Sequence, residues 1–142
     1  MVDIDFEAYN DAWDRHDGAA LASFFVPDGV YEDTTLHIRS EGREAIRKYV
    51  DNLAEEFSSD YRSAMGQPVI TDSAYAVEWV MSGIHDRSGP VLPATGKKFE
   101  IHGVSIGTIR DGKVVENHDY WDMATLLGQV GLMPAPGEAS AD

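Results

Sequence analysis

A long stretch of alternating residues near the C-terminal end constrains the fold of this chain more than any other feature. Lys97–Arg110 and Lys113–Trp121 each have the alternation and the β-branched and aromatic content of a strand. Asp111–Gly112 separates them, and Asp-Gly between two such runs is typical of a tight hairpin turn. The second strand carries Asp119 among aromatic residues, directly before a short amphipathic segment that predicts a helix. The hairpin therefore places a candidate acid or base at a strand end.

Helical spacing dominates the first half of the chain, and strand-like alternation follows it. Phe6, Tyr9 and Trp13 recur at helical spacing in a segment that ends near Asp17. The other predicted elements are a short helix over Ala19–Phe25, a strand over Val30–Asp33, a helix over Arg43–Phe57, and strands over Tyr61–Ile70 and Ala74–His85. This order predicts an α+β fold, in which helices pack on one face of a curved antiparallel sheet.

The length and composition suit one domain. The chain has 142 residues, of which 43% are hydrophobic, enough for a single core. We expect residues 1–133 to form the domain and residues 134–142 to be a disordered tail. No apolar run approaches the ~18 residues of a membrane span, and the first residues lack the features of a secretory signal. We therefore expect no membrane association and a cytoplasmic location.

Charge and composition exclude several classes of function. The formal net charge of −14 disfavours binding to nucleic acid or to anionic lipid, because both would repel the chain. The absence of cysteine excludes disulfides, thiolate nucleophiles and thiolate metal ligands. The five histidines are scattered over separate predicted elements, so we expect no metal site. The sequence has no phosphate-binding glycine loop and no dinucleotide fingerprint, and we predict no cofactor.

Strand parity gathers polar and aromatic side chains on one face of the sheet. The cluster takes residues from three predicted strands. Asn117, Asp119 and Trp121 lie on the last strand, Ser105 lies on the strand before it, and Tyr31 and Asp33 lie on the strand over Val30–Asp33. Gly103 and Gly107 flank Ser105 and leave room for something flat. An aspartate in such a partly dehydrated cavity should have a pKa above ~3.9, and of two neighbouring carboxylates one would keep its proton. Such a pair can serve as base and acid at neutral pH.

Several of these residues also have a structural interpretation. Asp119 could cap the last helix, but Asp122 directly precedes that helix and is the better N-cap, which leaves Asp119 free. Asp33 could organise the turn that follows it. Tyr9 and Trp13 could form a pocket wall, because aromatic residues at helical spacing usually pack.

Four motifs, together with the order of the predicted helices and strands, resemble a known family. They are Gly42-Arg43-Glu44-Ala45-Ile46, Pro93-Ala94-Thr95-Gly96-Lys97-Lys98, Arg110-Asp111-Gly112-Lys113-Val114-Val115-Glu116 leading to His118-Asp119, and Leu126-Leu127-Gly128-Gln129-Val130-Gly131-Leu132. Together they resemble the SnoaL-like polyketide cyclases, within the nuclear transport factor 2-like superfamily. The resemblance covers about residues 5–132. It implies a cone-shaped curved sheet that encloses one apolar pocket with three helices of the N-terminal half, and a short C-terminal helix.

The resemblance also implies roles for individual residues. In SnoaL-type cyclases an aspartate near the end of the last strand is the general acid/base of an aldol closure, and it corresponds to Asp119. Ser105 stands where these cyclases commonly have a histidine. In ketosteroid isomerases the base and a tyrosine that donates to the enolate oxygen correspond to Asp33 and Tyr9.

A third group, the limonene-type epoxide hydrolases, offers another comparison. The residues that hold the attacking water there resemble Tyr31, Asp33 and the segment Asp119-Tyr120-Trp121-Asp122. Trp79 and Met81, however, occupy the places of that group's charged residues. The resemblance therefore does not favour water activation of that kind.

The leading hypothesis is a cofactor-independent enzyme that moves protons on a hydrophobic, carbonyl-bearing small molecule. Asp119 is the principal acid/base, Asp33 the second carboxylate and Tyr9 a catalytic donor. The expected substrate-binding residues are Trp13, Tyr31, Trp79, Met81, Ser105, Asn117 and Trp121. Two alternatives stay open: double-bond isomerisation with Asp33 as base, and a non-catalytic binding module for an apolar ligand. Apolar residues on both sides of the strand through Trp79 also predict a homodimer.

Overall fold

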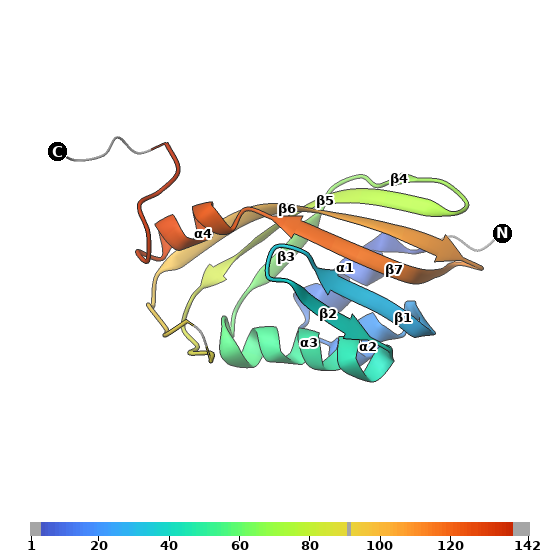
Figure 1. Ribbon diagram of the computed structural model, residues 1–142, viewed down its shortest axis with the longest axis horizontal. Helices are drawn as coiled ribbons and strands as arrows, with labels where there is room; N and C mark the ends of the chain where they lie inside the picture. The colour runs from blue at the N-terminus through green and yellow to red at the C-terminus, as the bar shows by residue number, and fades with distance from the viewer. Residues whose placement is uncertain (1–3, 91, 138–142) are drawn as a thin grey trace.

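A curved, unclosed sheet with helices on one face forms the protein (Figure 1). The computed structural model describes residues 4–90 and 92–137. Its helices are α1 (Phe6–Asp14), α2 (Gly18–Ala22), α3 (Arg43–Glu56) and α4 (Met123–Gln129). Its strands are β1 (Phe25–Asp33), β2 (Ile38–Glu41), β3 (Arg62–Met65), β4 (Val69–Ile70), β5 (Ala74–Ile84), β6 (Lys98–Arg110) and β7 (Lys113–Trp121). The predicted α+β class, with three N-terminal helices and a short C-terminal one, is confirmed.

The strands form one sheet in the order β2-β1-β7-β6-β5-β3, with β4 paired to β5. β6 and β7 form the predicted hairpin, and both of its turn residues, Asp111 (φ 52°) and Gly112 (φ 74°), adopt the left-handed backbone that suits a two-residue hairpin turn. One pairing departs from the expected antiparallel pattern, because β1 runs parallel to β7. Most of the chain connects these two strands, so no tight turn forces them to be antiparallel.

The pairing register brings the predicted polar cluster together. Ser105 on β6 lies opposite Asp119 on β7, and Asp119 lies opposite Asp33 on β1. Tyr31 is paired with Asn117 in the same way. All five side chains are buried on the helix-covered side, which is called the inner face below.

The N-terminal elements differ from the prediction at one boundary. The expected helix over Ala19–Phe25 ends at Ala22, and Phe25 already belongs to β1, where it pairs with Val114 of β7. The register shifts between Phe25 and Val30, where proline and glycine interrupt the regular ladder. The short edge strand β2, expected as a loop, pairs with the second half of β1.

The expected strand over Tyr61–Ile70 is in fact two short strands, β3 and β4, both paired with β5. Gly66 and Pro68 lie between them. Proline has no N–H to donate to a strand ladder, and glycine weakens a strand interior, so the break falls at these residues.

Capping aspartates fix the ends of three helices. Asp5 caps α1 and Asp17 caps α2, and the Asp122 side chain accepts a 3.0 Å hydrogen bond from the Thr125 backbone N–H at the start of α4. The last contact confirms that Asp122, and not Asp119, is the N-cap. Between the helices and the sheet lies an aromatic-rich core, which includes Phe6, Tyr9, Trp13, Phe25, Tyr31, Ile46, Val50, Tyr61, Tyr75, Val77, Phe99, Ile101 and Val114.

The chain continues past α4 as an irregular segment. Its described part brings the backbone of Ala135 against Gly128 of α4. The predicted disordered tail includes residues 138–142, which lie outside the described residues. In the part of the chain that the structure describes, no helix combines the length and apolar character needed to cross a membrane.

Candidate active site

An apolar pocket opens between α3, the inner face of the sheet and the loop after β5. Its volume is about 480 Å³, within the ~300–1,000 Å³ usual for small-molecule sites. All three tryptophans of the chain line it. The apolar lining includes Trp13, Leu36, Ile38, Tyr49, Leu53, Phe57, Met65, Trp79, Met81, Leu92, Ile101, Trp121, Met123 and Leu126. Asp33, Asp119, Ser105 and the Tyr31 hydroxyl add polar groups to one wall.

Asp119 lies at the centre of this polar wall and is only 5% exposed. Its Oδ1 accepts hydrogen bonds from Ser105 Oγ at 2.5 Å and from Asn117 Nδ2 at 2.9 Å, and its Oδ2 accepts one from the Tyr31 hydroxyl. A carboxylate has about four lone-pair positions. Within the described residues, one position on Oδ2 is thus left to accept a proton from a bound molecule.

Burial raises the pKa of Asp119 from its ordinary value of 3.8 to about 6. The three donors favour the ionised form and hold the pKa back, whereas the charge of Asp33 raises it further. Burial and the charge of Asp119 raise the pKa of Tyr31 well above its ordinary value, so the phenol keeps its proton. Asp119 can therefore exchange a proton near neutral pH while Tyr31 remains a donor.

Asp33 is held differently, although it lines the same pocket and is 2% exposed. Its Oδ1 accepts from the Leu36 backbone N–H at 2.9 Å and from Trp121 Nε1 at 3.0 Å. Its Oδ2 accepts from the Tyr49 hydroxyl at 2.5 Å and, at 3.2 Å, from the same indole. The Leu36 contact is the turn anticipated from the sequence. Three donors thus contact Asp33, and because the indole N–H is shared, each of its oxygens accepts two contacts, whereas Oδ2 of Asp119 accepts only one.

Two aromatic rings lie flat on glycines of β6 and support the Asp119 network. Trp79 is paired with Gly103 and donates from Nε1 to Ser105 Oγ at 3.0 Å. Tyr75 is paired with Gly107, and its hydroxyl donates to Asn117 Oδ1. The room that the glycines were expected to leave for something flat is filled by the protein's own rings. Ser105 and Asn117, which both contact Asp119, are thereby fixed in place.

The close fit over Gly103 predicts a large effect of one added methyl group. A Cβ at Gly103 would lie 2.3 Å from the Trp79 ring, so Gly103→Ala should lower the free energy of unfolding by roughly 1–3 kcal/mol. Urea denaturation measures this loss. Gly66→Ala is the matched control, because its Cβ would meet nothing closer than 3.5 Å. Equal stability of the two variants would contradict the proposed fit.

Comparison with known proteins agrees with this architecture. Residues 6–117 match the family of SnoaL-like domains, which is most of the chain. The chain belongs to the SnoaL-like family. No curated protein matches the sequence.

Solved structures similar to this SnoaL-like protein share its fold at low sequence identity. One is a protein of ketosteroid isomerase-like fold from Catenulispora acidiphila, in complex with trimethylamine (TM-score 0.75, 20% identity, 90% of this chain and 92% of that one). Another is a candidate polyketide cyclase from Xanthomonas campestris (TM-score 0.73, 22% identity, 88% and 93%). A third is IdmH, a candidate polyketide cyclase from Streptomyces antibioticus (TM-score 0.69, 24% identity, 89% and 95%). These similarities support the fold predicted from the sequence.

Most of the predicted site residues of the SnoaL-like protein meet at the pocket. Those that line it are Trp13, Tyr31, Asp33, Trp79, Met81, Ser105, Asp119 and Trp121. Asn117 is fully buried behind the wall and contacts Asp119. Tyr9 is absent from the lining, and its hydroxyl is buried. Its ring contacts Phe6 and Phe24 and belongs to the hydrophobic core, not to the pocket wall.

Two tyrosines of the SnoaL-like protein belong to the site although the sequence did not single them out. Tyr49 lies on the face of α3 that was expected only to pack, yet its hydroxyl bonds Asp33. Tyr75 reaches Asn117 from β5. A signal for Tyr75 and Trp79 does exist, because two aromatic residues four apart on β5 face two glycines four apart on β6.

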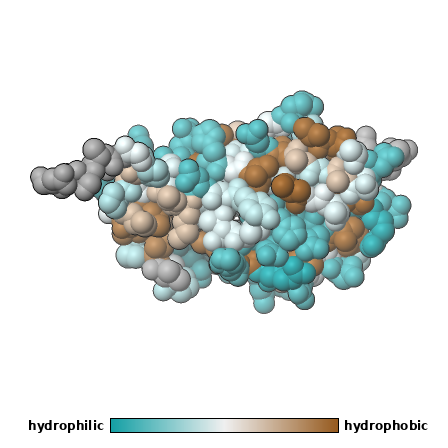
Figure 2. All heavy atoms as spheres, turned by 45° about the horizontal axis from the view of Figure 1, so that its top comes forward, coloured by the Kyte–Doolittle hydropathy of each residue, from teal (hydrophilic) through white to brown (hydrophobic). Residues whose placement is uncertain are grey.

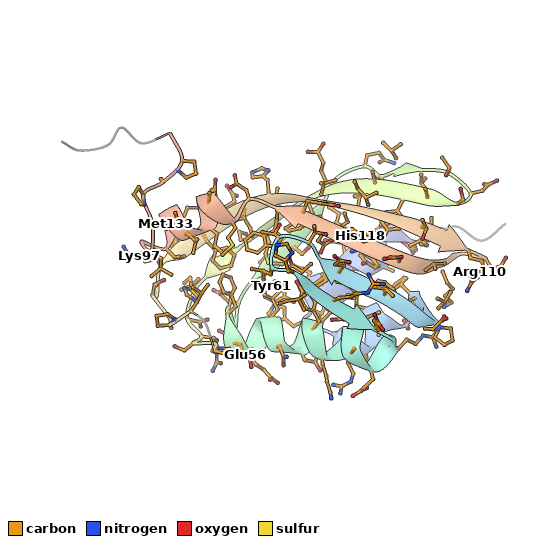
Figure 3. All side chains as sticks on the ribbon, viewed as in Figure 1. Glu56, Tyr61, Lys97, Arg110, His118 and Met133 are labelled. Atoms are coloured by element: carbon orange, nitrogen blue, oxygen red, sulfur yellow. The ribbon has the colours of Figure 1, made fainter. Side chains whose placement is uncertain are left out.

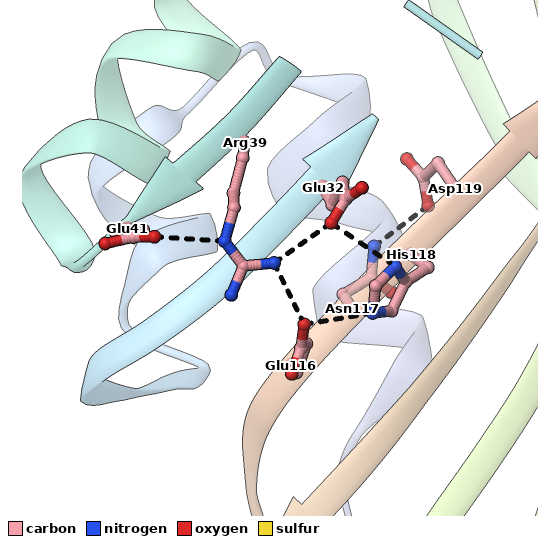
Figure 4. Close-up of polar contacts among 7 residues, drawn as sticks. All are labelled: Glu32, Arg39, Glu41, Glu116, Asn117, His118 and Asp119. Carbon is pink, nitrogen blue, oxygen red and sulfur yellow. Dashed lines mark hydrogen bonds and ion pairs between the residues drawn. The ribbon is translucent and has the colours of Figure 1, made fainter. Parts of the chain in front are cut away.

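The opposite, outer face of the sheet carries a charged cluster. Oxygens of Glu32 and Glu116 and a ring nitrogen of His118 lie within 4.8 Å of one another, a grouping that could hold a metal ion. Arg39 already bonds this cluster, with 3.0 Å to Glu32 and 3.2 Å to Glu116, and also contacts Glu41 (Figure 4). The guanidinium supplies the positive charge that the carboxylates require, so the cluster is explained as an ion-pair network.

The outer face also exposes hydrophobic side chains beside these charges. Ile106 on β6 is 48% exposed and Tyr120 on β7 is 46% exposed. Figure 2, turned so that this side comes forward, shows hydrophobic residues interspersed with hydrophilic ones. The homodimer expected from the sequence stays a prediction.

Proposed function

We propose that this SnoaL-like protein is a cofactor-independent acid/base enzyme that acts on a hydrophobic, carbonyl-bearing small molecule. The observation that carries the proposal is the state of Asp119. It is buried in an apolar pocket, its pKa is raised to about 6, and one acceptor position on Oδ2 remains for the substrate. A carboxyl group with a pKa near the working pH is suited to both removing and returning a proton.

The proposed reaction begins with removal of a proton from the carbon next to a substrate carbonyl. The C–H electron pair becomes the enolate, and the proton goes to Oδ2 of Asp119. In an aldol closure, the enolate carbon then attacks a second carbonyl of the same molecule, which forms a C–C bond and an alkoxide. Asp119 returns its proton to that alkoxide. The step consumes no oxidant, reductant or cofactor.

The Tyr31 hydroxyl can donate first to the Asp119 carboxylate and then to the enolate oxygen, as the negative charge passes from one to the other. While Asp119 is ionised, the Tyr31 hydroxyl donates to it. Once Asp119 holds the substrate proton, the negative charge resides on the enolate oxygen, and the phenol can turn its hydrogen bond to that oxygen. Such donors stabilise developing charge strongly in a site from which water is excluded.

The contacts of the two carboxylates favour Asp119 over Asp33 as the base. Each oxygen of Asp33 already accepts two hydrogen-bond contacts, from Leu36, Tyr49 and the shared N–H of Trp121, whereas Oδ2 of Asp119 accepts only one. Its charge instead raises the pKa of Asp119. The isomerase alternative, with Asp33 as base, would require one of these donors to leave.

The test is the pH dependence of binding of a phenol that imitates the enol intermediate. A steroid with a phenolic ring, such as equilenin, should bind best when Asp119 is protonated and can donate to the phenol oxygen. We expect its dissociation constant to be constant below pH ~6 and to rise by up to about tenfold per pH unit above it. The phenol itself titrates near ~10 and so does not interfere.

Two variants separate the roles of the carboxylates in this test. In Asp119→Asn the amide replaces the protonated acid, so binding should become independent of pH. In Asp33→Asn the dependence should persist with a lower apparent pKa, because a neighbouring negative charge is gone. If pH dependence is absent from the parent protein, or survives in Asp119→Asn, the acid/base role is wrong and the pocket is a simple binding site.

A further inference from the structure

The mouth of the pocket has its own row of polar side chains, separate from the Asp119 network. Lys48, Asn52 and Glu56 follow one another at four-residue spacing on α3, and all three are exposed and line the pocket. Tyr49 and Leu53, on the adjacent row, are only partly exposed and line it as well. Figure 3 shows Glu56 at the end of α3 that lies on the same side as Lys97 and Met133. The row therefore runs along the helix at the rim.

Lys48 differs from the other basic residues of α3. Arg43 donates to the backbone oxygen of Phe25, and Arg47 pairs with Glu44 and Asp51. Lys48 makes no hydrogen bond or ion pair within the described residues, and it is the one basic side chain among those that line the pocket. Its charge acts on Glu44, one turn earlier, without a close ion pair among the described residues. At the entrance of the pocket, Lys48 is therefore available to an anionic group.

We propose that Lys48 and Asn52 bind a carboxylate on the substrate, held at the mouth while the carbonyl end reaches Asp119. The proposal rests on the proposed function and adds the chemical class of the substrate, an aromatic or polycyclic keto acid. The apolar walls between the two ends accommodate its ring system. Lys48 supplies the charge, and the Asn52 amide supplies a neutral donor.

The donor set favours a carboxylate over a phosphate. Lys48 and Asn52 lie in the middle of α3, where the backbone N–H groups donate to carbonyl oxygens of the same helix. The subsite therefore has two side-chain donors and no free backbone N–H groups to bind an anion. A doubly charged group would need more donors. Glu56, one turn beyond Asn52, would also repel a second negative charge.

Binding of a matched acid and ester tests this inference. The probes are anthraquinone-2-carboxylic acid and its methyl ester, and the readout is quenching of the fluorescence of the three tryptophans, all of which line the pocket. Lys48→Met should weaken binding of the acid by about three- to fivefold, as for a partly exposed ion pair, and leave the ester unchanged. Lys48→Glu should weaken the acid further, and added salt should reduce the difference.

Lys98→Met is the matched control. Lys98 is also exposed, and its loss changes the net charge equally, but it lies outside the pocket lining. A decrease for the acid alone, in the Lys48 variants alone, supports the carboxylate subsite. Equal weakening of acid and ester, no change, or the same change in Lys98→Met overturns it while leaving the Asp119 chemistry intact. If neither probe binds the parent protein, the substrate is not an aromatic carbonyl compound of this kind. That result would contradict both the proposed function and the carboxylate subsite.

Discussion

Asp119→Asn is expected to lower kcat/KM for proton abstraction by about 10²- to 10⁴-fold, the usual contribution of a well-placed acid or base. The amide fills the same space but cannot accept the proton. The assay uses loss of deuterium from the carbon next to the carbonyl of a bicyclic aryl ketone, followed by NMR, which reports the first step without knowledge of the natural product. In the parent protein the rate should rise with pH and level off above ~6, because the base must be ionised.

Asp33→Asn is the control for this result. Because each of its oxygens already accepts two hydrogen-bond contacts, it should lose much less activity than Asp119→Asn. Its profile should shift to lower pH, because removal of the Asp33 charge makes Asp119 more acidic. A larger loss in Asp33→Asn than in Asp119→Asn would instead favour the isomerase-like mechanism with Asp33 as base.

The same carboxyl group should make the stability of the protein depend on pH. Burial raises the pKa of Asp119 from 3.8 to about 6, so the folded protein holds this proton over a range where the unfolded chain releases it. The resulting stability is fully present below pH ~4 and is lost as the pH rises through ~6. The change of this pKa from 3.8 to about 6 corresponds to about 2 kcal/mol of unfolding free energy between pH 4 and pH 7.

Urea denaturation of the parent protein and of Asp119→Asn at several pH values measures this effect. The difference in unfolding free energy between the two proteins is the informative quantity. Carboxylates whose pKa is lowered by local hydrogen bonds are present in both proteins and cancel, namely Asp14, Glu44, Asp86 and Asp122. A difference that stays constant from pH 4 to pH 7 would show that Asp119 is not destabilised as an ion.

The sequence predicts the centre of the site well because local rules determine it. Alternation on β7 and the Asp111–Gly112 turn fix which side chains point inward, so Asp119 and Ser105 fall opposite one another. The N-cap preference of aspartate assigns Asp122 to α4 and leaves Asp119 for another role. These inferences need no information on distant parts of the chain.

Features that depend on long-range packing are missed. The contact of Tyr49 with Asp33 joins a helix to a strand, and helical spacing alone shows only that Tyr49 faces the core. The parallel pairing of β1 with β7 depends on the whole intervening chain. The placement of Tyr9 away from the pocket lining depends on how α1 is rotated against Phe24, which its spacing cannot specify.

The packing of Trp79 on Gly103 links the shape of the pocket wall to the acidity of Asp119, two properties that evolution would otherwise adjust separately. The indole is both a wall of the pocket and the donor to Ser105, which in turn donates to Asp119. A substitution that reshapes this wall for a new substrate therefore also changes the acidity of the carboxyl group. The exposed row of α3 has no such connection to Asp119. Descendants of this protein should thus acquire new substrates first through changes on α3, while the β5–β6 wall is inherited as a unit.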